Sequence, residues 1–390
     1  MPFMSRQPVL DQNKQITACR ILIEERGKGE IKPEFREKMG DFLLQDRVII
    51  PQDQEDLKQA LRKVRPRSHI GIEFNRSPVT EKESLLDLCQ LMKECGFRLI
   101  VNGEIMGRAP EKLGEITDII CIDYSQAEQR ELKSQLSDKD LQFMAGNLHT
   151  ETAFNRARRQ GYSYFQGDFY TRPGNSQPRK DIPALKLNYM NLLQKINQPE
   201  PDFSEIERII KNDISLSYNL FRLINSAYFG IKNEVKSIRQ ALILLGINDF
   251  KKWVSLKIMR GLTEDRPGVL MQTSLNRAKF AENLAIPLNL EQKQLDLFML
   301  GLFSLIDSFL NRPLEEVITN LSLSPDIKKA LLNYEGKLGL VLELITAFEQ
   351  GRWNRVDKIL NSLKLEPSVI SRIYFESVIS TNEAIKVLNN

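Results

Sequence analysis

The sequence contains very little histidine. Its only two among 390 residues are His69 and His149, so no imidazole follows residue 149. A metal centre built from several imidazoles needs more than one histidine within reach of the ion. The long C-terminal part of the chain therefore cannot assemble such a centre.

Cysteine is also scarce, and its spacing is uninformative. Cys19, Cys89, Cys95 and Cys121 all lie in the first third of the chain, and no two of them form a CxxC pair. Four scattered cysteines in a chain of this length are typical of buried thiols in a reducing compartment. We expect neither a disulfide framework nor a zinc site.

Long apolar runs and a strong excess of charge are absent too. The longest strongly apolar stretch, residues 297–310, is too short to span a bilayer and contains Asp307. The N-terminus lacks the apolar core of a signal peptide. With 55 basic and 51 acidic residues, the net charge is only +4. We therefore predict a cytoplasmic protein that needs neither a membrane nor a nucleic acid as partner.

The first 170 residues alternate between short β-rich runs and amphipathic helical patterns. Repeated strand–helix alternation indicates parallel βα units, arranged as a barrel or as a doubly wound sheet. The predicted strands cover residues 16–23, 48–50, 69–74, 99–101, 119–122, 142–145 and 163–165.

A stretch rich in proline, glycine and serine, residues 171–178, ends this alternation. From Asp181 onward the pattern is helical, with short apolar stripes that end at glycines such as Gly230 and Gly246. We predict a first domain over residues 1–172, a linker over 173–183 and an all-helical domain over 184–390.

Polar residues follow several predicted strands, where parallel βα folds place their sites. A hydrolytic metal site needs convergent carboxylates, for which Glu73, Glu104, Asp123 and Asp168 are candidates. A solvated polar rim is the alternative, since strand ends carry polar residues in any such fold. No GxGxxG, Walker-type, GxSxG or HExxH motif is present.

Five segments of the chain form recognisable motifs: SRQPVLD at residues 5–11, IICID at 119–123, YFQGDF at 164–169, INSAYFG at 224–230 and SIRQALILLG at 237–246. These segments resemble the EAL–HDOD family of signal transduction proteins, the YuxH-like group. The resemblance covers nearly the whole chain. It implies a modified (β/α)8 EAL-type barrel followed by a helical HDOD domain.

EAL domains, when active, hydrolyse cyclic di-GMP with a metal-binding carboxylate cluster, and this sequence departs from that pattern at most positions. Arg20 stands where the signature glutamate is expected, and Cys121 where a catalytic lysine is expected. The remaining departures fall on Glu24, Pro51, Asn102, Gly103, Gly146 and His149. Glu73, Asp123 and Gln166 match the pattern.

These departures predict that the barrel is not an enzyme, because two acids beside the cation of Arg20 balance too little metal charge. The barrel then keeps a vestigial nucleotide site formed by Arg20, Glu73, Asn102, Asp123 and Gln166. Two roles remain open for Arg20. It attracts the phosphates of a nucleotide without metal, or it pairs with Glu73 as a structural ion pair.

HDOD domains resemble HD-type phosphohydrolases that lack the metal ligands. Ser304 and Leu305 stand here where histidine and aspartate would bind metal, and Asp307 follows. We therefore expect no metal and no cofactor in either domain. Asn225, Ser226 and Tyr228 either cap a helix end or contact a partner, and Trp253 is either core or interface.

The resemblance predicts an inactive signalling scaffold that works through protein–protein contacts in second-messenger regulation. Its protein partner is unidentified, and a homodimer is compatible with the family. One alternative is a metal-independent receptor for cyclic di-GMP or another nucleotide. The other is an active cyclic di-GMP phosphodiesterase.

Overall fold

The computed structural model describes most of both predicted domains. The described residues are 3–24, 47–51, 69–74, 82–107, 110–126, 131, 133, 141–173, 191–192, 194–198, 200–225, 235, 237–262, 267–319, 321 and 323–389. Nearly all of the predicted linker, together with Ser226 and Tyr228, lies outside them.

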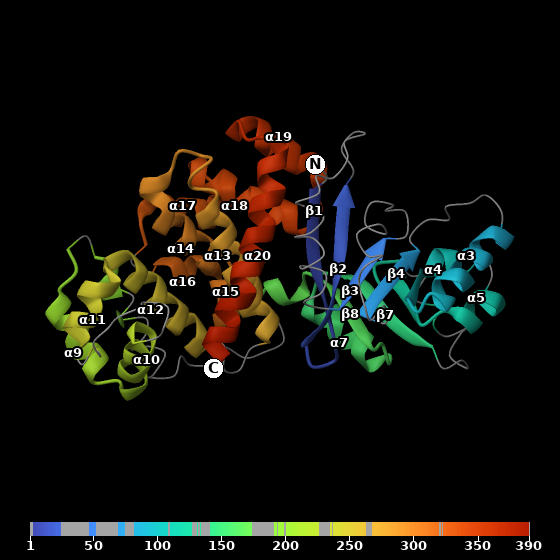
Figure 1. The fold of residues 1–390 in the computed structure, drawn as a ribbon, viewed down its shortest axis with the longest axis horizontal. Coiled ribbons are helices and arrows are strands. Elements are labelled where there is room, and N and C mark those ends of the chain that lie inside the picture. Colours follow the sequence, from blue (N-terminus) through green and yellow to red (C-terminus); the bar gives the residue numbers. More distant parts are fainter. Residues whose placement is uncertain are drawn as a thin grey trace. The chain divides into compact units, whose positions relative to one another are not determined.

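Eight strands form a closed barrel in the order β1 to β8 (Figure 1). Strand β1 is antiparallel to both of its neighbours, β2 and β8, and all other neighbouring pairs are parallel. The strands are β1 (Phe3–Leu10), β2 (Ile16–Glu24), β3 (Val48–Pro51), β4 (Ile70–Phe74), β5 (Arg98–Asn102), β6 (Ile119–Asp123), β7 (Gln142–Leu148) and β8 (Tyr164–Gly167). The predicted modified barrel is confirmed.

Seven of these strands coincide with predicted runs, and β1 does not. Its centre, Ser5 to Pro8, is polar and contains a proline, so it lacks the apolar alternation that identifies a strand. Pairing with β2 and β8 makes it a strand nevertheless. Closure of the barrel supplies the hydrogen-bond partners that local sequence does not reveal.

The barrel interior is layered along its axis. Its middle is an apolar cluster contributed by Val9, Ile49, Ile100, Ile119, Cys121 and Met144. Arg20 and Glu73 lie toward the C-terminal ends of the parallel strands, and Arg47 and Arg98 lie at the N-terminal ends. The apolar middle layer separates these two polar ends.

The described helices of the barrel region lie in the segments that follow β4, β5, β7 and β8. They are α3 (Lys82–Glu94), α4 (Gly103–Met106), α5 (Pro110–Ile116), α7 (Glu151–Arg159) and the 3-10 turn η2 (Phe169–Thr171). Thr150 caps α7 by accepting a hydrogen bond from the amide of Ala153. Phe154 of α7 stacks on Phe169 at 4.7 Å and so fixes the chain after β8.

The rest of the described chain is helical, as predicted. Its helices are α9 (Phe203–Lys211), α10 (Ile214–Ile224), α11 (Ile238–Leu245), α12 (Ile247–Leu262), α13 (Gly268–Asn283), the 3-10 turn η4 (Glu291–Lys293), α14 (Gln294–Phe303), α15 (Ile306–Leu310), α16 (Leu314–Thr319), α17 (Pro325–Asn333), α18 (Gly336–Glu349), α19 (Trp353–Leu363) and α20 (Pro367–Asn389). Asp202 caps α9 through the amides of Ser204 and Glu205. None of the described helices is long and apolar enough to cross a membrane.

The chain forms two compact units whose bounds differ from the predicted domains. One unit contains residues 1–176, 267–272 and 343–390, and the other contains residues 177–266 and 273–342. Phe3 of β1 packs against Phe348 and Trp353, and the Arg6 amide donates to the Tyr374 hydroxyl at 3.1 Å. The end of α18 and helices α19 and α20 therefore group with the barrel, although sequence pattern assigned them to the helical domain.

Candidate functional site

A buried ion pair lies at the C-terminal ends of the barrel strands. The Arg20 Nε donates to the Glu73 Oε2 at 2.7 Å. The Glu73 side chain is 0% exposed and that of Arg20 is 18% exposed. The structure therefore joins two of the predicted site residues, which are 53 positions apart in sequence.

The Glu73 carboxylate stabilises the charged form of Arg20. Burial by itself lowers the pKa of Arg20, but the adjacent Glu73 carboxylate raises it, and the net direction is upward. The guanidinium therefore stays charged. The second Glu73 oxygen, Oε1, is buried and accepts no hydrogen bond from any described residue.

Cys121 lies beside the pair on β6. Burial, followed by the neighbouring Glu73 carboxylate, raises the pKa of the Cys121 thiol to about 12. The thiol is therefore neutral at physiological pH and is a poor metal ligand or nucleophile. Its position, where the family pattern expects a lysine, thus carries no charge in this chain.

Asp123 and Gln166 belong to a hydrogen-bond network at the same strand ends. The Asn147 Nδ2 donates to the Asp123 Oδ2 at 3.0 Å, and the Asn147 amide donates to the Gln166 Oε1 at 3.2 Å. The Gln166 Nε2 in turn donates to the Gln7 Oε1 at 2.5 Å. A Cβ on Gly146 would lie 3.5 Å from both the Cys121 Sγ and the Gln166 Oε1, so this network adjoins the buried ion pair.

Asn102, the fifth residue of the predicted site, has a local role. Its side chain caps α4 by accepting from the Glu104 amide at 2.8 Å. This bond engages the carbonyl oxygen of the side chain. The structure therefore gives Asn102 a capping contact and shows no bond from it to the other four site residues.

Gln7 and Asn147 were not among the predicted site residues. Gln7 was missed because β1 was not recognised, although it pairs with Arg20 across the ladder. Asn147 has a φ of +56°, which asparagine tolerates better than most residues. A glycine–asparagine pair directly after the predicted run 142–145 was the available signal for this irregular position, which lies within β7.

His149 and Asp168 form a further pair at the ends of β7 and β8. The His149 Nδ1 lies 2.6 Å from the Asp168 Oδ1, and the imidazole side chain is 61% exposed. Arg172 contacts the other Asp168 oxygen at 3.4 Å. The carboxylate orients the ring, and its exposed position makes the imidazole available to a solvent-borne ligand.

The described residues of this region do not fit the metal cluster that the EAL family implies. Among them there is no group of three or more His, Cys, Asp or Glu side chains placed to hold an ion. Glu73 is committed to Arg20, and Asp123 accepts from Ser125 and Asn147. One buried carboxylate beside a fixed guanidinium balances little of a divalent charge.

The described candidate residues of the helical part make structural contacts. Asn225 at the end of α10 bonds both backbone groups of Val235, donating at 3.1 Å and accepting at 2.7 Å. Trp253 is buried and stacks with Phe250. Partner contact by these residues remains a prediction.

The residues at and near the positions of the HD-type metal ligands make hydrogen bonds within the protein. Ser304 accepts from an Arg277 nitrogen at 3.2 Å and donates to the Gly301 carbonyl at 2.8 Å. Burial raises the pKa of Asp307, which accepts from the Ser308 amide at 2.7 Å. The Asp307 carboxylate therefore stabilises the local backbone turn.

Comparison with known proteins identifies relatives for both halves of the chain. A model of the HDOD domain family matches residues 182–319. "Cyclic di-GMP phosphodiesterase CdgJ" of Vibrio cholerae is 27% identical over 385 residues, covering 91% of this chain and 87% of the relative. "Uncharacterized protein YuxH" of Bacillus subtilis is 26% identical over 399 residues, covering 93% and 94%.

Solved structures of EAL domains are similar to part of this chain, with low TM-scores. "PaMucR Phosphodiesterase, c-di-GMP complex" has a TM-score of 0.35 and 14% identity, covering 48% of this chain and 99% of that chain. An EAL domain protein of Listeria monocytogenes has a TM-score of 0.33 and 12% identity, covering 43% and 87%.

The prediction that the chain is not an enzyme is contradicted by the Vibrio cholerae relative, which is named a phosphodiesterase and aligns with both halves. That prediction counted only the positions of the family pattern. Carboxylates elsewhere, such as Asp53 and Glu55 directly after β3, were not counted, and they lie outside the described residues. Together, these findings show a closed eight-stranded barrel followed in sequence by a segment that matches the HDOD domain family, and the two relatives align with both parts.

Proposed function

We propose that this chain acts in second-messenger signalling and that its barrel binds cyclic di-GMP at the C-terminal ends of the strands. The observation that carries the proposal is the Arg20–Glu73 pair, bordered by the amides of Gln7, Asn147 and Gln166. The relative named a cyclic di-GMP phosphodiesterase supports the choice of cyclic di-GMP as the ligand.

The residues of this region suit the two chemical parts of a cyclic dinucleotide. A guanidinium is a strong hydrogen-bond partner for phosphate oxygens, and Arg20 stays charged at neutral pH. Guanine presents both donors and acceptors on its edges, which amide and carboxylate side chains recognise. The Asp123–Asn147–Gln166 network offers both kinds of group close to the arginine.

Hydrolysis of cyclic di-GMP is the second candidate, and the name of the Vibrio cholerae relative favours it. The described residues alone do not supply a metal cluster for this reaction. Turnover would therefore draw on side chains outside the described residues. The exposed His149 beside Asp168 is the described group best placed to move a proton.

Calorimetric titration with cyclic di-GMP, with and without Mn²⁺, tests the proposal when the mixtures are also analysed for the linear dinucleotide. We expect saturable binding in both conditions. Formation of the linear dinucleotide in the presence of Mn²⁺ would support hydrolysis as well as binding. Absence of saturable binding in both conditions would refute the proposal.

The paired replacement Arg20→Met with Glu73→Leu removes the charges together and avoids a lone buried charge. We expect it to weaken binding at least tenfold. Arg159→Gln is the matched control, because Arg159 is exposed on α7. Equal affinity of both variants would show that the dinucleotide does not use Arg20.

For the helical domain we propose contact with a protein partner. Helices α10 and α11 expose Tyr218 (64%), Ile243 (75%) and Leu244 (48%), an unusual amount of apolar surface for neighbouring helices. Cross-linked capture by the wild type but not by Ile243→Lys supports a partner at this surface. Sedimentation of the purified chain determines whether that partner is a second copy.

A further inference from the structure

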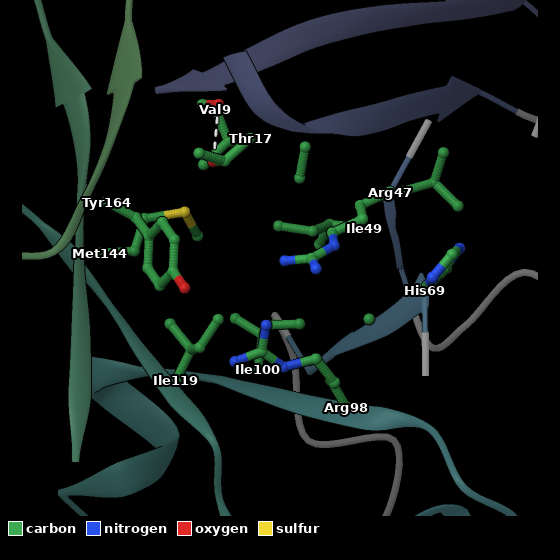
Figure 2. Close-up of a pocket in the computed structure, with 13 residues that line it drawn as sticks. Val9, Thr17, Arg47, Ile49, His69, Arg98, Ile100, Ile119, Met144 and Tyr164 are labelled. Carbon is green, nitrogen blue, oxygen red and sulfur yellow. Dashed lines mark hydrogen bonds between the residues drawn. The ribbon is translucent and has the colours of Figure 1, made fainter. Parts of the chain in front are cut away.

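A second polar site lies at the opposite end of the barrel from Arg20 and Glu73. A pocket opens between the N-terminal ends of the strands, where the chain enters β3, β4, β5 and β8 (Figure 2). Its cavity volume is about 40 Å³. No residue of this pocket belongs to the Arg20–Glu73 site.

The pocket has an apolar wall and a cationic rim. The wall is formed by the middle layer of the barrel, and the described residues lining it include Val9, Ile49, Ile100, Ile119 and Met144. The rim carries Arg47, His69, Arg98 and Tyr164. None of the described residues that line the pocket is an aspartate or a glutamate.

Arg47 and Arg98 have no carboxylate partner within the described parts of the chain. Arg98 donates to the Gln142 Oε1 at 3.0 Å, and the Tyr164 hydroxyl donates to the same oxygen at 3.2 Å. Figure 2 shows both guanidinium groups and the Tyr164 hydroxyl pointing into the pocket. Two like charges that converge with no counter-ion among the described residues favour the binding of an anion.

The shape of the pocket restricts the class of anion. A cavity of about 40 Å³ has room for roughly three water molecules, or for the short alkyl group of a carboxylate whose charged end lies at the rim. A planar carboxylate matches the fork of a guanidinium, and the apolar wall accommodates an alkyl group. The same wall offers no hydrogen bonds to the inner oxygens of a phosphate, which would lose their hydration.

We propose that this pocket binds a short-chain monocarboxylate, with its carboxylate between Arg47 and Arg98 and its alkyl group against Ile100 and Met144. The site is independent of the cyclic di-GMP proposal, because it shares no residue with that site. It gives the barrel a second ligand position at the end that is structural in most (β/α)8 enzymes.

Saturation-transfer NMR on the full chain with propionate tests the proposal. Propionamide, which has the same shape without the charge, and inorganic phosphate are titrated in parallel. We expect saturable binding of propionate, at least tenfold weaker binding of the other two compounds, and weakening of the propionate signal as salt rises. No saturable propionate binding, or equal binding of phosphate, would overturn the proposal.

Two variants locate the bound propionate. Arg98→Gln removes one charge and should weaken binding at least tenfold, whereas the exposed Arg159→Gln should leave it unchanged. Gly71→Ala is a second, uncharged probe, because the added Cβ would lie 2.4 Å from the Ile100 Cδ1 at the pocket wall. Unchanged affinity in both Arg98→Gln and Gly71→Ala would place the ligand elsewhere.

Discussion

Arginine side chains face the barrel interior at both of its ends, but a described carboxylate pairs with the arginine only at the C-terminal ends of the strands. At the C-terminal ends, Arg20 is largely buried and lies 2.7 Å from the buried Glu73 carboxylate. At the N-terminal ends, Arg47 and Arg98 face a small pocket whose described lining contains no carboxylate. The apolar middle layer keeps these ends apart.

The difference follows from access to water. A buried guanidinium loses its hydration and is stable only with a fixed counter-charge, which Glu73 supplies. An arginine at a rim remains solvated and needs no protein partner. Loss of Arg20 should therefore affect the stability of the barrel as well as ligand binding, while loss of a rim arginine should affect ligand binding alone.

Removing one member of the buried pair should have the largest effect. Arg20→Met leaves the Glu73 charge buried without a partner, and we expect a loss of about 3–5 kcal/mol in the free energy of unfolding. Urea unfolding monitored by circular dichroism measures it. Adding Glu73→Leu to this variant should restore most of the loss, and a double variant as unstable as the single one would contradict the pairing.

The thiol beside the buried pair should be nearly unreactive. With the pKa of Cys121 raised from 9.0 to about 12, its thiolate fraction at pH 8 is about a thousandfold below that of an ordinary thiol. Titration of the native protein with a thiol reagent should modify the partly exposed Cys95 first. Rapid modification of Cys121 in a Cys95→Ser variant would show that this end of the barrel is open.

Two glycines should respond differently to the same added methyl group. Gly167 has a φ of +153°, and a Cβ there would lie 2.0 Å from the Leu148 carbonyl oxygen, so Gly167→Ala should cost about 2–3 kcal/mol. Gly71→Ala meets the flexible end of Ile100 and should cost about 1 kcal/mol or less. Unfolding free energies of the two variants, measured side by side, decide whether the C-terminal end is the more rigid.

The smallest effect is expected at the N-terminal rim. Arg98→Gln removes a charge that faces Arg47 and breaks no ion pair among the described residues, so the free energy of unfolding should change by less than about 0.5 kcal/mol. The variant should be relatively more stable at low salt, where repulsion between the arginines is least screened. A loss comparable to that of Arg20→Met would show that Arg98 has a buried partner.

Much of the fold was accessible from sequence. Alternating strand and helix patterns predicted parallel βα units, as a barrel or a doubly wound sheet, and the family resemblance implied the barrel. INSAYFG with SIRQALILLG pointed to the HDOD domain. Strand β1 was missed because its centre is polar. The grouping of residues 343–390 with the barrel was missed because contacts such as Phe3 with Trp353 join the two ends of the chain.

The candidate site was accessible only in part. Glu73, Asp123 and Gln166 lie at the C-terminal ends of recognisable strands, so their common location could be predicted. Their partners Gln7 and Asn147 depend on the antiparallel strand β1 and on an irregular backbone after Gly146. The N-terminal pocket had no sequence signal, because Arg47 and Arg98 lie far apart in sequence and belong to no motif.

Local pattern and composition were enough to establish the class of fold and to exclude chemistry that needs several imidazoles. Both follow from short-range periodicity and from a residue count. The resemblance left two roles open for Arg20, and folding decided in favour of the ion pair with Glu73. That choice depends on the register around a closed barrel and on depth from water, and neither quantity is written in any local stretch of the chain.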